Sequence, residues 1–151
     1  MRSKLLFGLI GGALGGVAMK AVVATVDKNA FGLSTGTDVK AARALTRQFG
    51  LPVPSREEAV VLGAAMHYTF ALGAGLAYPL CAEAFPSIRF AKGAAFGTAL
   101  WLIGDELLVW ITGLENPAHV PLKSHVSALG AHIIFGIVVE TLVSSVERNR
   151  A

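Results

Sequence analysis

The residues of this sequence that could do chemistry are acids and histidines inside apolar stretches. Asp105 and Glu106 stand side by side within residues 93–113, a stretch with the composition of a membrane-spanning helix. A carboxylate in the hydrocarbon region costs about 2.5 kcal/mol or more, so it normally faces protein or water. Carboxylates and histidines in such positions are the groups that membrane proteins use to handle protons or cations.

The spacing of small residues predicts which way the two acids point. Four residues recur at four-residue intervals and share one stripe of an α-helix: Gly93, Gly97, Trp101 and Asp105. Glu106 lies about 100° round the helix axis from this stripe. We therefore expect Asp105 to point into a helix bundle and Glu106 to lie at a boundary between helices.

Ionisable residues in the other apolar stretches extend this candidate site. Seven residues make up the candidate intramembrane cluster: Lys20, His67, Asp105, Glu106, His125, His132 and Glu140. We expect His67, Asp105 and His132 to converge in the bundle. Lys20 or Glu106 should lie at the edge of this group. Because histidine titrates between about pH 5 and 8, the charge of the cluster should change in that range.

The same residues are also compatible with a structural network in which each polar group satisfies another. Depth along four spans puts Glu140 towards the opposite membrane side from the other six residues. Lys20 lies close to the end of its stretch, so its ammonium has a second option, which is to reach the interface instead of an acid.

Four apolar stretches must position these residues, at 5–26, 59–81, 91–113 and 124–146. Each is long enough to cross a bilayer as a helix. The chain is 54% hydrophobic and only 15% charged, whereas a soluble domain carries about 25% charged residues. We therefore predict an all-α, polytopic membrane protein: a single domain over residues 1–151, with four transmembrane helices in a bundle.

Glycine rows predict how these helices pack. Gly8, Gly12 and Gly16 form a doubled G-x-x-x-G pattern, which in an apolar helix marks a face for close approach. The predicted packing glycines are, in all, Gly8, Gly12, Gly16, Gly63, Gly75, Gly93, Gly97 and Gly136. The first stretch also has the charged start and apolar centre of a signal peptide, but it continues through Val26, which favours a retained span.

The polar segment between the first two stretches predicts a further, amphipathic helix. Residues 37–49 place apolar side chains on one side of a helix and basic ones on the other. Such a helix beside a membrane is expected to lie in the headgroup plane, and a solvated loop helix is the alternative. Ser55 and Glu58 form an S-x-x-E capping box at the start of the second span, and Ser124 is the expected N-cap of the fourth.

The sequence argues against an enzyme and against nucleic-acid binding. It has no Gly-x-Ser-x-Gly elbow, His-Glu-x-x-His motif or phosphate loop. The net charge is only +3 and the basic residues are scattered, so no nucleic-acid surface is expected. No cofactor is expected either; a metal ion held between helices, or a haem between His67 and His132, is a remote alternative. Cys81 is the only cysteine, which leaves no intramolecular disulfide.

The expected partners are membrane lipid and other membrane helices. Four short helices barely enclose a pathway, so transport would need a homo-oligomer, for which glycine faces are suited. The alternative is an accessory subunit that packs its glycine-rich faces on a larger membrane complex. Basic residues divide evenly between the two membrane sides. Because the longer loop counts less per charge, we expect both termini in the cytoplasm.

Residues 67–86, HYTFALGAGLAYPLCAEAFP, followed by the polar position Asp105, resemble the YagU-like family of bacterial inner-membrane proteins. The last apolar stretch, with His132 and Glu140 in AHIIFGIVVE, resembles the family too. The resemblance covers residues 59–150 and implies a small multi-pass protein of the bacterial inner membrane. It also implies a role of the acid-tolerance type, and it supports five recurrent polar positions: His67, Glu83, Asp105, His132 and Glu140.

Overall fold

The computed structural model describes residues 1–26, 36–114 and 116–148. Its α-helices are, in chain order, α1 (Arg2–Val26), α2 (Gly36–Gln48), α3 (Arg56–Ala84), α4 (Ala94–Trp101), α5 (Val109–Ile111) and α6 (Leu122–Arg148). Three shorter elements of other helix types are the 3-10 helices η1 (Pro86–Arg89) and η3 (Pro117–His119) and the π-helix η2 (Leu102–Leu108). No strand occurs among the described residues, and the all-α fold class is confirmed.

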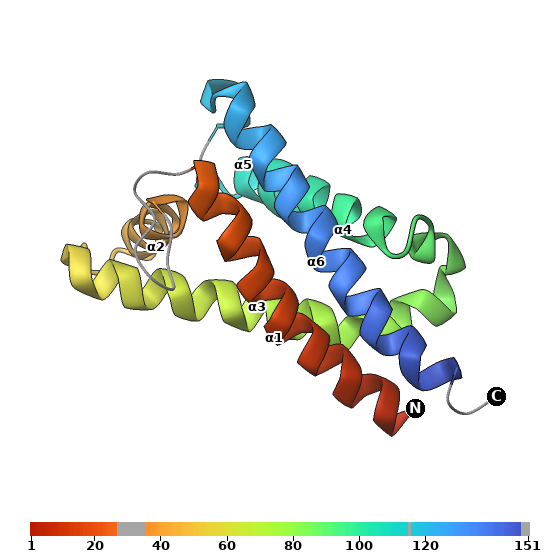
Figure 1. Ribbon diagram of the computed structural model, residues 1–151. Helices are drawn as coiled ribbons and strands as arrows, with labels where there is room; N and C mark the ends of the chain where they lie inside the picture. Colours follow the sequence, from red (N-terminus) through yellow and green to blue (C-terminus); the bar gives the residue numbers. More distant parts are fainter. Residues whose placement is uncertain (27–35, 115, 149–151) are drawn as a thin grey trace.

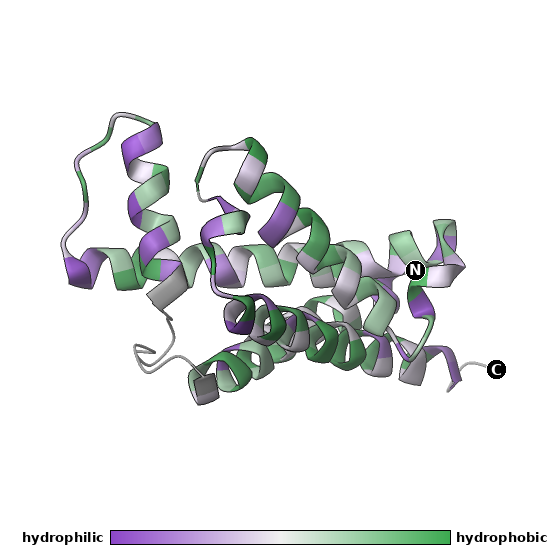
Figure 2. Ribbon diagram, turned by 90° about the horizontal axis from the view of Figure 1, so that it is seen from above, coloured by the Kyte–Doolittle hydropathy of each residue, from purple (hydrophilic) through white to green (hydrophobic). Residues whose placement is uncertain are grey.

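Four helical stretches are long and apolar enough to cross a membrane: Arg2–Ala24, Arg56–Ala84, Ala94–Ile111 and Leu122–Arg148. The third runs through α4, η2 and α5 without a break. Figure 2 shows that the long helices are largely hydrophobic, whereas α2 alternates between hydrophilic and hydrophobic residues. Four stretches of this kind indicate a multi-pass membrane protein.

Two predicted helix starts are displaced in the structure. The third span begins at Ala94 rather than at residue 91, because Ala91, Lys92 and Gly93 have left-handed backbone with φ of 51°, 57° and 88°. Such a conformation cannot continue into a right-handed helix. The fourth span begins at Leu122, so the prediction that Ser124 is its N-cap is wrong.

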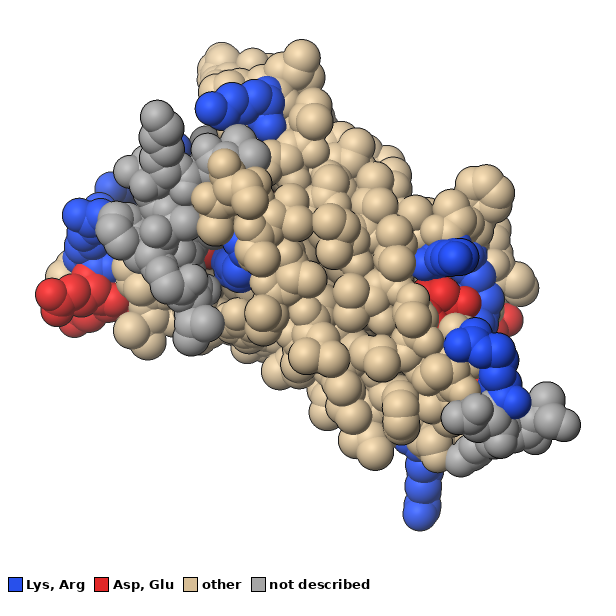
Figure 3. Space-filling model, in the orientation of Figure 1, with Lys and Arg blue, Asp and Glu red and all other residues tan. Residues whose placement is uncertain are grey.

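The helices pack in a fixed order. Helix α1 lies between α3 and α6, α6 packs on its other side against α4, and α2 packs on α3 (Figure 1). The N-terminus of α1 and the C-terminus of α6 lie at one end of the bundle, here named the terminal end (Figure 1). Helix α2 and the turn between α5 and α6 lie at the opposite end, here named the loop end. Figure 3 shows a broad uncharged face with charged side chains gathered towards both ends.

Close approach between helices occurs where a side chain would not fit. A Cβ atom added to Gly12 of α1 would collide with the carbonyl oxygen of Ala71 on α3, and one added to Gly97 of α4 would collide with that of His132 on α6. All eight glycines predicted for packing face another element of the same chain: Gly8, Gly12, Gly16, Gly63, Gly75, Gly93, Gly97 and Gly136. Backbone contact of this kind is how apolar helices associate in lipid.

An aromatic core fills the middle of the bundle. It consists of Tyr78 on α3, Phe96 on α4 and Phe135 on α6, all of them buried. The ring centroids of Tyr78 and Phe96 are 4.7 Å apart in an edge-on arrangement, and those of Phe96 and Phe135 are 6.4 Å apart. Ala71 of α3 and Val139 of α6 pack against these rings. The core therefore separates the loop end from the terminal end.

The predicted amphipathic helix is confirmed as a helix by α2. Ala42 is buried against the bundle, and Lys40 and Arg47 are exposed. The capping box that starts α3 is confirmed as well: the Glu58 N–H donates to Ser55 Oγ at 3.2 Å, and the Ser55 N–H donates to Glu58 Oε2 at 2.8 Å. The location of α2 in the headgroup plane stays a prediction.

Candidate functional site

The two acids of the third span lie in the π-helix η2. In a π-helix the backbone hydrogen bonds join residues five apart, which adds a residue to the turn and rotates every later side chain round the axis. The four-residue stripe through Gly97 and Trp101 therefore does not continue to Asp105. The structure departs from the expectation here, since the Asp105 side chain is 44% exposed and that of Glu106 only 21%. π-helical turns are frequent at functional sites.

Asp105 and His132 form the first of two histidine–carboxylate pairs between η2 and α6. His132 Nδ1 lies 3.8 Å from Asp105 Oδ2, and the His132 ring is buried. Nδ1 also lies 2.9 Å from the carbonyl oxygen of Ala128, to which it donates, because a carbonyl can only accept. The contact with Asp105 is therefore electrostatic, and it becomes an ion pair when the imidazole is charged.

Glu106 and His125 form the second pair, in which the imidazole lies between two acceptors. His125 Nδ1 is 2.5 Å from Glu106 Oε1, and Nε2 is 3.0 Å from the carbonyl oxygen of Pro117 in η3. A neutral imidazole has only one N–H, and an ionised carboxylate has none. Both hydrogen bonds can form together only when the pair holds one additional proton.

Lys20 and His67 lie on the other side of the loop end. Lys20 is only 8% exposed, and its ammonium pairs with the Asp38 carboxylate of α2. His67 Nε2 donates to the carbonyl oxygen of Gly16 at 3.1 Å. The contact between Lys20 and Asp38 connects α1 to α2 at the loop end.

Electrostatic interactions join these pairs into one loop-end cluster: Lys20, Asp38, His67, Asp105, Glu106, His125 and His132. His132 interacts electrostatically both with His67 and with Asp105, and the convergence of all three residues stays a prediction. Only Asp105 and His132 are in direct contact among these three. Asp38 was not predicted from the sequence. The feature that could have indicated it is its position as a lone acid in the first turn of an otherwise basic helix.

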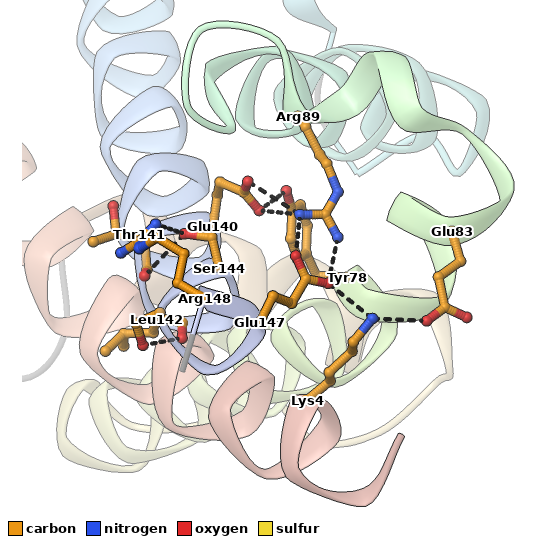
Figure 4. A network of polar contacts seen from close by, with 11 residues as sticks. Lys4, Tyr78, Glu83, Arg89, Glu140, Thr141, Leu142, Ser144, Glu147 and Arg148 are labelled. Carbon is orange, nitrogen blue, oxygen red and sulfur yellow. Dashed lines mark hydrogen bonds and ion pairs between the residues drawn. The ribbon is translucent and has the colours of Figure 1, made fainter. Parts of the chain in front are cut away.

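Glu140 does not belong to the loop-end cluster. It lies at the terminal end, where it accepts from the Tyr78 hydroxyl at 2.5 Å and from Arg89 Nη1 at 3.2 Å (Figure 4). Its side chain is 12% exposed. The sequence had already placed Glu140 towards this side, but its partners Tyr78 and Arg89 were not foreseen.

The terminal-end network extends from Glu140 across four elements (Figure 4). Arg89 of η1 also binds both carboxylate oxygens of Glu147, at 2.9 and 3.0 Å. Lys4 of α1 lies 2.8 Å from Glu147 and 3.1 Å from Glu83 of α3. Burial alone would lower the pKa of Arg89, but the hydrogen bonds to Glu147 and the charges of both glutamates outweigh it and raise that pKa. The guanidinium is thus held in its charged form.

The described residues contain no group of three or more histidine, cysteine, aspartate or glutamate side chains arranged to hold a metal ion. At the loop end there is, however, an open cavity of about 400 Å³ between α2 and the end of α5. The Gln48 side chain crosses between these elements and donates to the Thr112 carbonyl at 2.8 Å. The cavity is lined by Ala44, Arg47, Gln48, Thr112, Gly113 and Leu114.

Comparison with known proteins identifies the family. A family described as "Protein of unknown function (DUF1440)" matches residues 42–141. The chain belongs to this family. The matched residues run from within α2 to Thr141 of α6 and include both histidine–carboxylate pairs. No curated protein and no solved structure gives a match.

Proposed function

We propose that this protein is a small proton- or cation-responsive protein of the bacterial inner membrane, and that the loop-end cluster is its responsive part. The observation that carries the proposal is the position of His125 between two acceptors, Glu106 and the Pro117 carbonyl. At low pH the pair holds the additional proton and joins η2, η3 and α6. When the proton leaves, one of the two hydrogen bonds is lost and η2 or η3 is released.

The charged groups around His125 and His132 make this change cooperative. They come from every element that meets at the loop end: Lys20 of α1, Asp38 of α2, His67 of α3, and Asp105 and Glu106 of η2. In an interior of low dielectric constant, a change of charge at one group alters the protonation equilibria of its neighbours. A small cation bound near the exposed Asp105 carboxylate would act on the same groups as a proton.

The expected membrane orientation and the family resemblance both favour a response to acid outside the cytoplasm. With both termini in the cytoplasm, the loop end faces the periplasm, the compartment whose pH follows the medium. The resemblance to the YagU-like family carries the expectation of an acid-tolerance role, and a periplasm-facing histidine–carboxylate cluster would suit such a role. No enzymatic activity is proposed.

The alternative of an accessory subunit has less support. The eight glycines that would form its docking faces are covered by helices of the same chain. Transport through one copy is also disfavoured, because the aromatic core fills the middle of the bundle. A flux of protons or cations would need a pathway between copies of a homo-oligomer, and we therefore favour a sensing role.

The test compares wild-type protein with His125→Gln in liposomes, recording the unfolding temperature and proton flux at pH 5 and pH 8. Glutamine can donate to the Pro117 carbonyl without titrating, so we expect the pH dependence of the unfolding temperature to fall by at least about half. His119 is exposed at the same end, so His119→Ala is the control and should retain the wild-type pH dependence of the unfolding temperature. If His125→Gln, Asp105→Asn and His132→Ala all retain the wild-type pH dependence and flux, the loop-end cluster is not a responsive site.

A further inference from the structure

We infer that the loop-end cluster exchanges protons or small cations with one side of the membrane only, the side of the loop end. The inference rests on the proposed function and specifies its regulation: the protein would report the pH or cation concentration of a single compartment. It is argued from three parts of the structure: the exposed Asp105 carboxylate at the loop end, the apolar layer in the middle of the bundle, and a separate polar network at the terminal end.

The accessible group is Asp105. Its side chain is the most exposed among the ion-paired members of the loop-end cluster. It nevertheless interacts electrostatically with Asp38 of α2 and with His125 and His132 of α6. The exposed carboxylate therefore belongs to the polar groups of the loop end, where the cavity between α2 and α5 also opens. We infer that Asp105, the more exposed member of its pair, exchanges protons before the buried His132.

The middle of the bundle offers no polar continuation from His132. Glu140, the next ionisable residue on α6, is eight positions further along, or about 12 Å. Phe135 and Val139 lie between them on α6 and are fully enclosed, and Phe96 of α4 packs against Phe135. Moving a charge through such an apolar layer without a partner is strongly unfavourable.

The ionisable side chains at the terminal end pair with one another. Glu140 accepts from Tyr78, whose side chain is fully buried, and from Arg89. Arg89 in turn binds Glu147, and Lys4 joins Glu147 to Glu83. Glu83 is 45% exposed, so this network meets its own side of the membrane, but the enclosed Phe135 and Val139 separate it from the loop-end cluster.

Cysteine accessibility in sealed vesicles tests the inference. In a Cys81→Ala background, single cysteines are placed at Asp105, at Ser124 on the loop end and at Ser87 on the terminal end; both serines are exposed. A charged, membrane-impermeant thiol reagent is then added to one side at a time. We expect Asp105→Cys to react from the side that labels Ser124→Cys, and at least about tenfold more slowly from the side that labels Ser87→Cys, because thiolates react only where reagent and water reach them.

Comparable labelling of Asp105→Cys from both sides, labelling from the Ser87 side, or no labelling from either side would overturn the inference. Glu106→Cys serves as a second reporter if Asp105→Cys does not fold. The result is independent of the proposed function, since accessibility is measured whether or not the protein responds to pH. Loss of the pH response with one-sided labelling intact would refute the function and leave the access route standing.

Discussion

At the terminal end, Arg89 binds two glutamates at once and Lys4 joins one of them to a third, so that each of these charges meets an opposite charge within about 3 Å. At the loop end, His132 meets Asp105 only at 3.8 Å, and His125 lies between two acceptors. The first set uses arginine and lysine, which stay charged at any physiological pH. The second set contains the Lys20–Asp38 pair as well, but its contacts between η2 and α6 use histidine, whose charge changes in the physiological pH range.

The difference separates two uses of ionisable residues in one apolar bundle. Permanent charges with complete partners hold elements together and are costly to break. Titratable groups whose contacts are long or incomplete lose less free energy when their charge changes, and they can therefore respond to pH. We therefore expect substitutions at the terminal end to have large effects on stability, and substitutions of the loop-end histidine–carboxylate pairs to affect pH dependence more than stability.

The largest effect is expected from Arg89→Met, which removes the cation shared by Glu140 and Glu147. Glu140 would remain buried without it, and breaking a buried ion pair costs about 3–5 kcal/mol. Unfolding in mild detergent, followed by circular dichroism, measures the loss. Arg148→Met is the matched control, because Arg148 is exposed and its hydrogen bond within the described residues is to the Ser144 hydroxyl; its replacement should cost less than about 0.5 kcal/mol.

Gly97→Ala should come next, since the new methyl group would collide with the His132 carbonyl and push α4 from α6. Overpacking of this kind costs about 1–3 kcal/mol. Because the same interface carries the Asp105–His132 pair, the pH dependence should change too. Gly73→Ala is the control, as no atom lies within 4 Å of a Cβ at that position. Equal stability of both variants would contradict the close approach of α4 and α6.

Lys20→Met should loosen α2 locally rather than unfold the bundle. It removes the ion pair with Asp38, and a hydrogen bond to a charged group contributes about 1.5–3 kcal/mol. Limited trypsin digestion should then cleave faster after Arg47, which is exposed on α2. Lys40→Met, on the exposed face of the same helix, should leave the cleavage rate unchanged. An unaltered rate in Lys20→Met would show that α2 is held by other contacts.

Asp105→Asn should have the smallest effect on stability, below about 1 kcal/mol at pH 8, because its side chain is 44% exposed and its contact with His132 is long, at 3.8 Å. The difference in unfolding temperature between pH 5 and pH 8 should nevertheless shrink. A loss of stability as large as that of Arg89→Met would show that the two ends do not differ in the way described.

Much of the architecture could be predicted from the sequence because it depends on local composition. The four spans follow from apolar length, and the Ser55–Glu58 box follows from spacing within one turn. The inward position of Lys20 was foreseen as one of two options, because it continues a glycine row. These features need no knowledge of the hydrogen-bond register or of distant partners.

The remaining features depend on information that residue spacing does not carry. The π-helix changes the register at Leu102–Leu108, so the stripe that correctly included Gly97 misplaced Asp105. Arg89 lies in a short 3-10 helix between two spans, 51 residues from Glu140, and no periodicity links them. Contacts between side chains of separate elements, which only the tertiary fold brings together, could therefore not be predicted from the sequence.

The most direct test of the central contrast is hydrogen–deuterium exchange of the reconstituted protein at pH 5 and pH 8, corrected for the intrinsic exchange rate and read by mass spectrometry. We expect the corrected uptake to differ between the two pH values in peptides from α2, η2 and the first turns of α6. We also expect His125→Gln to remove much of this difference. Peptides from η1 and the last turns of α3 and α6 should exchange equally at both pH values. A pH-dependent difference at the terminal end, or one at the loop end that His125→Gln leaves unchanged, would contradict the account.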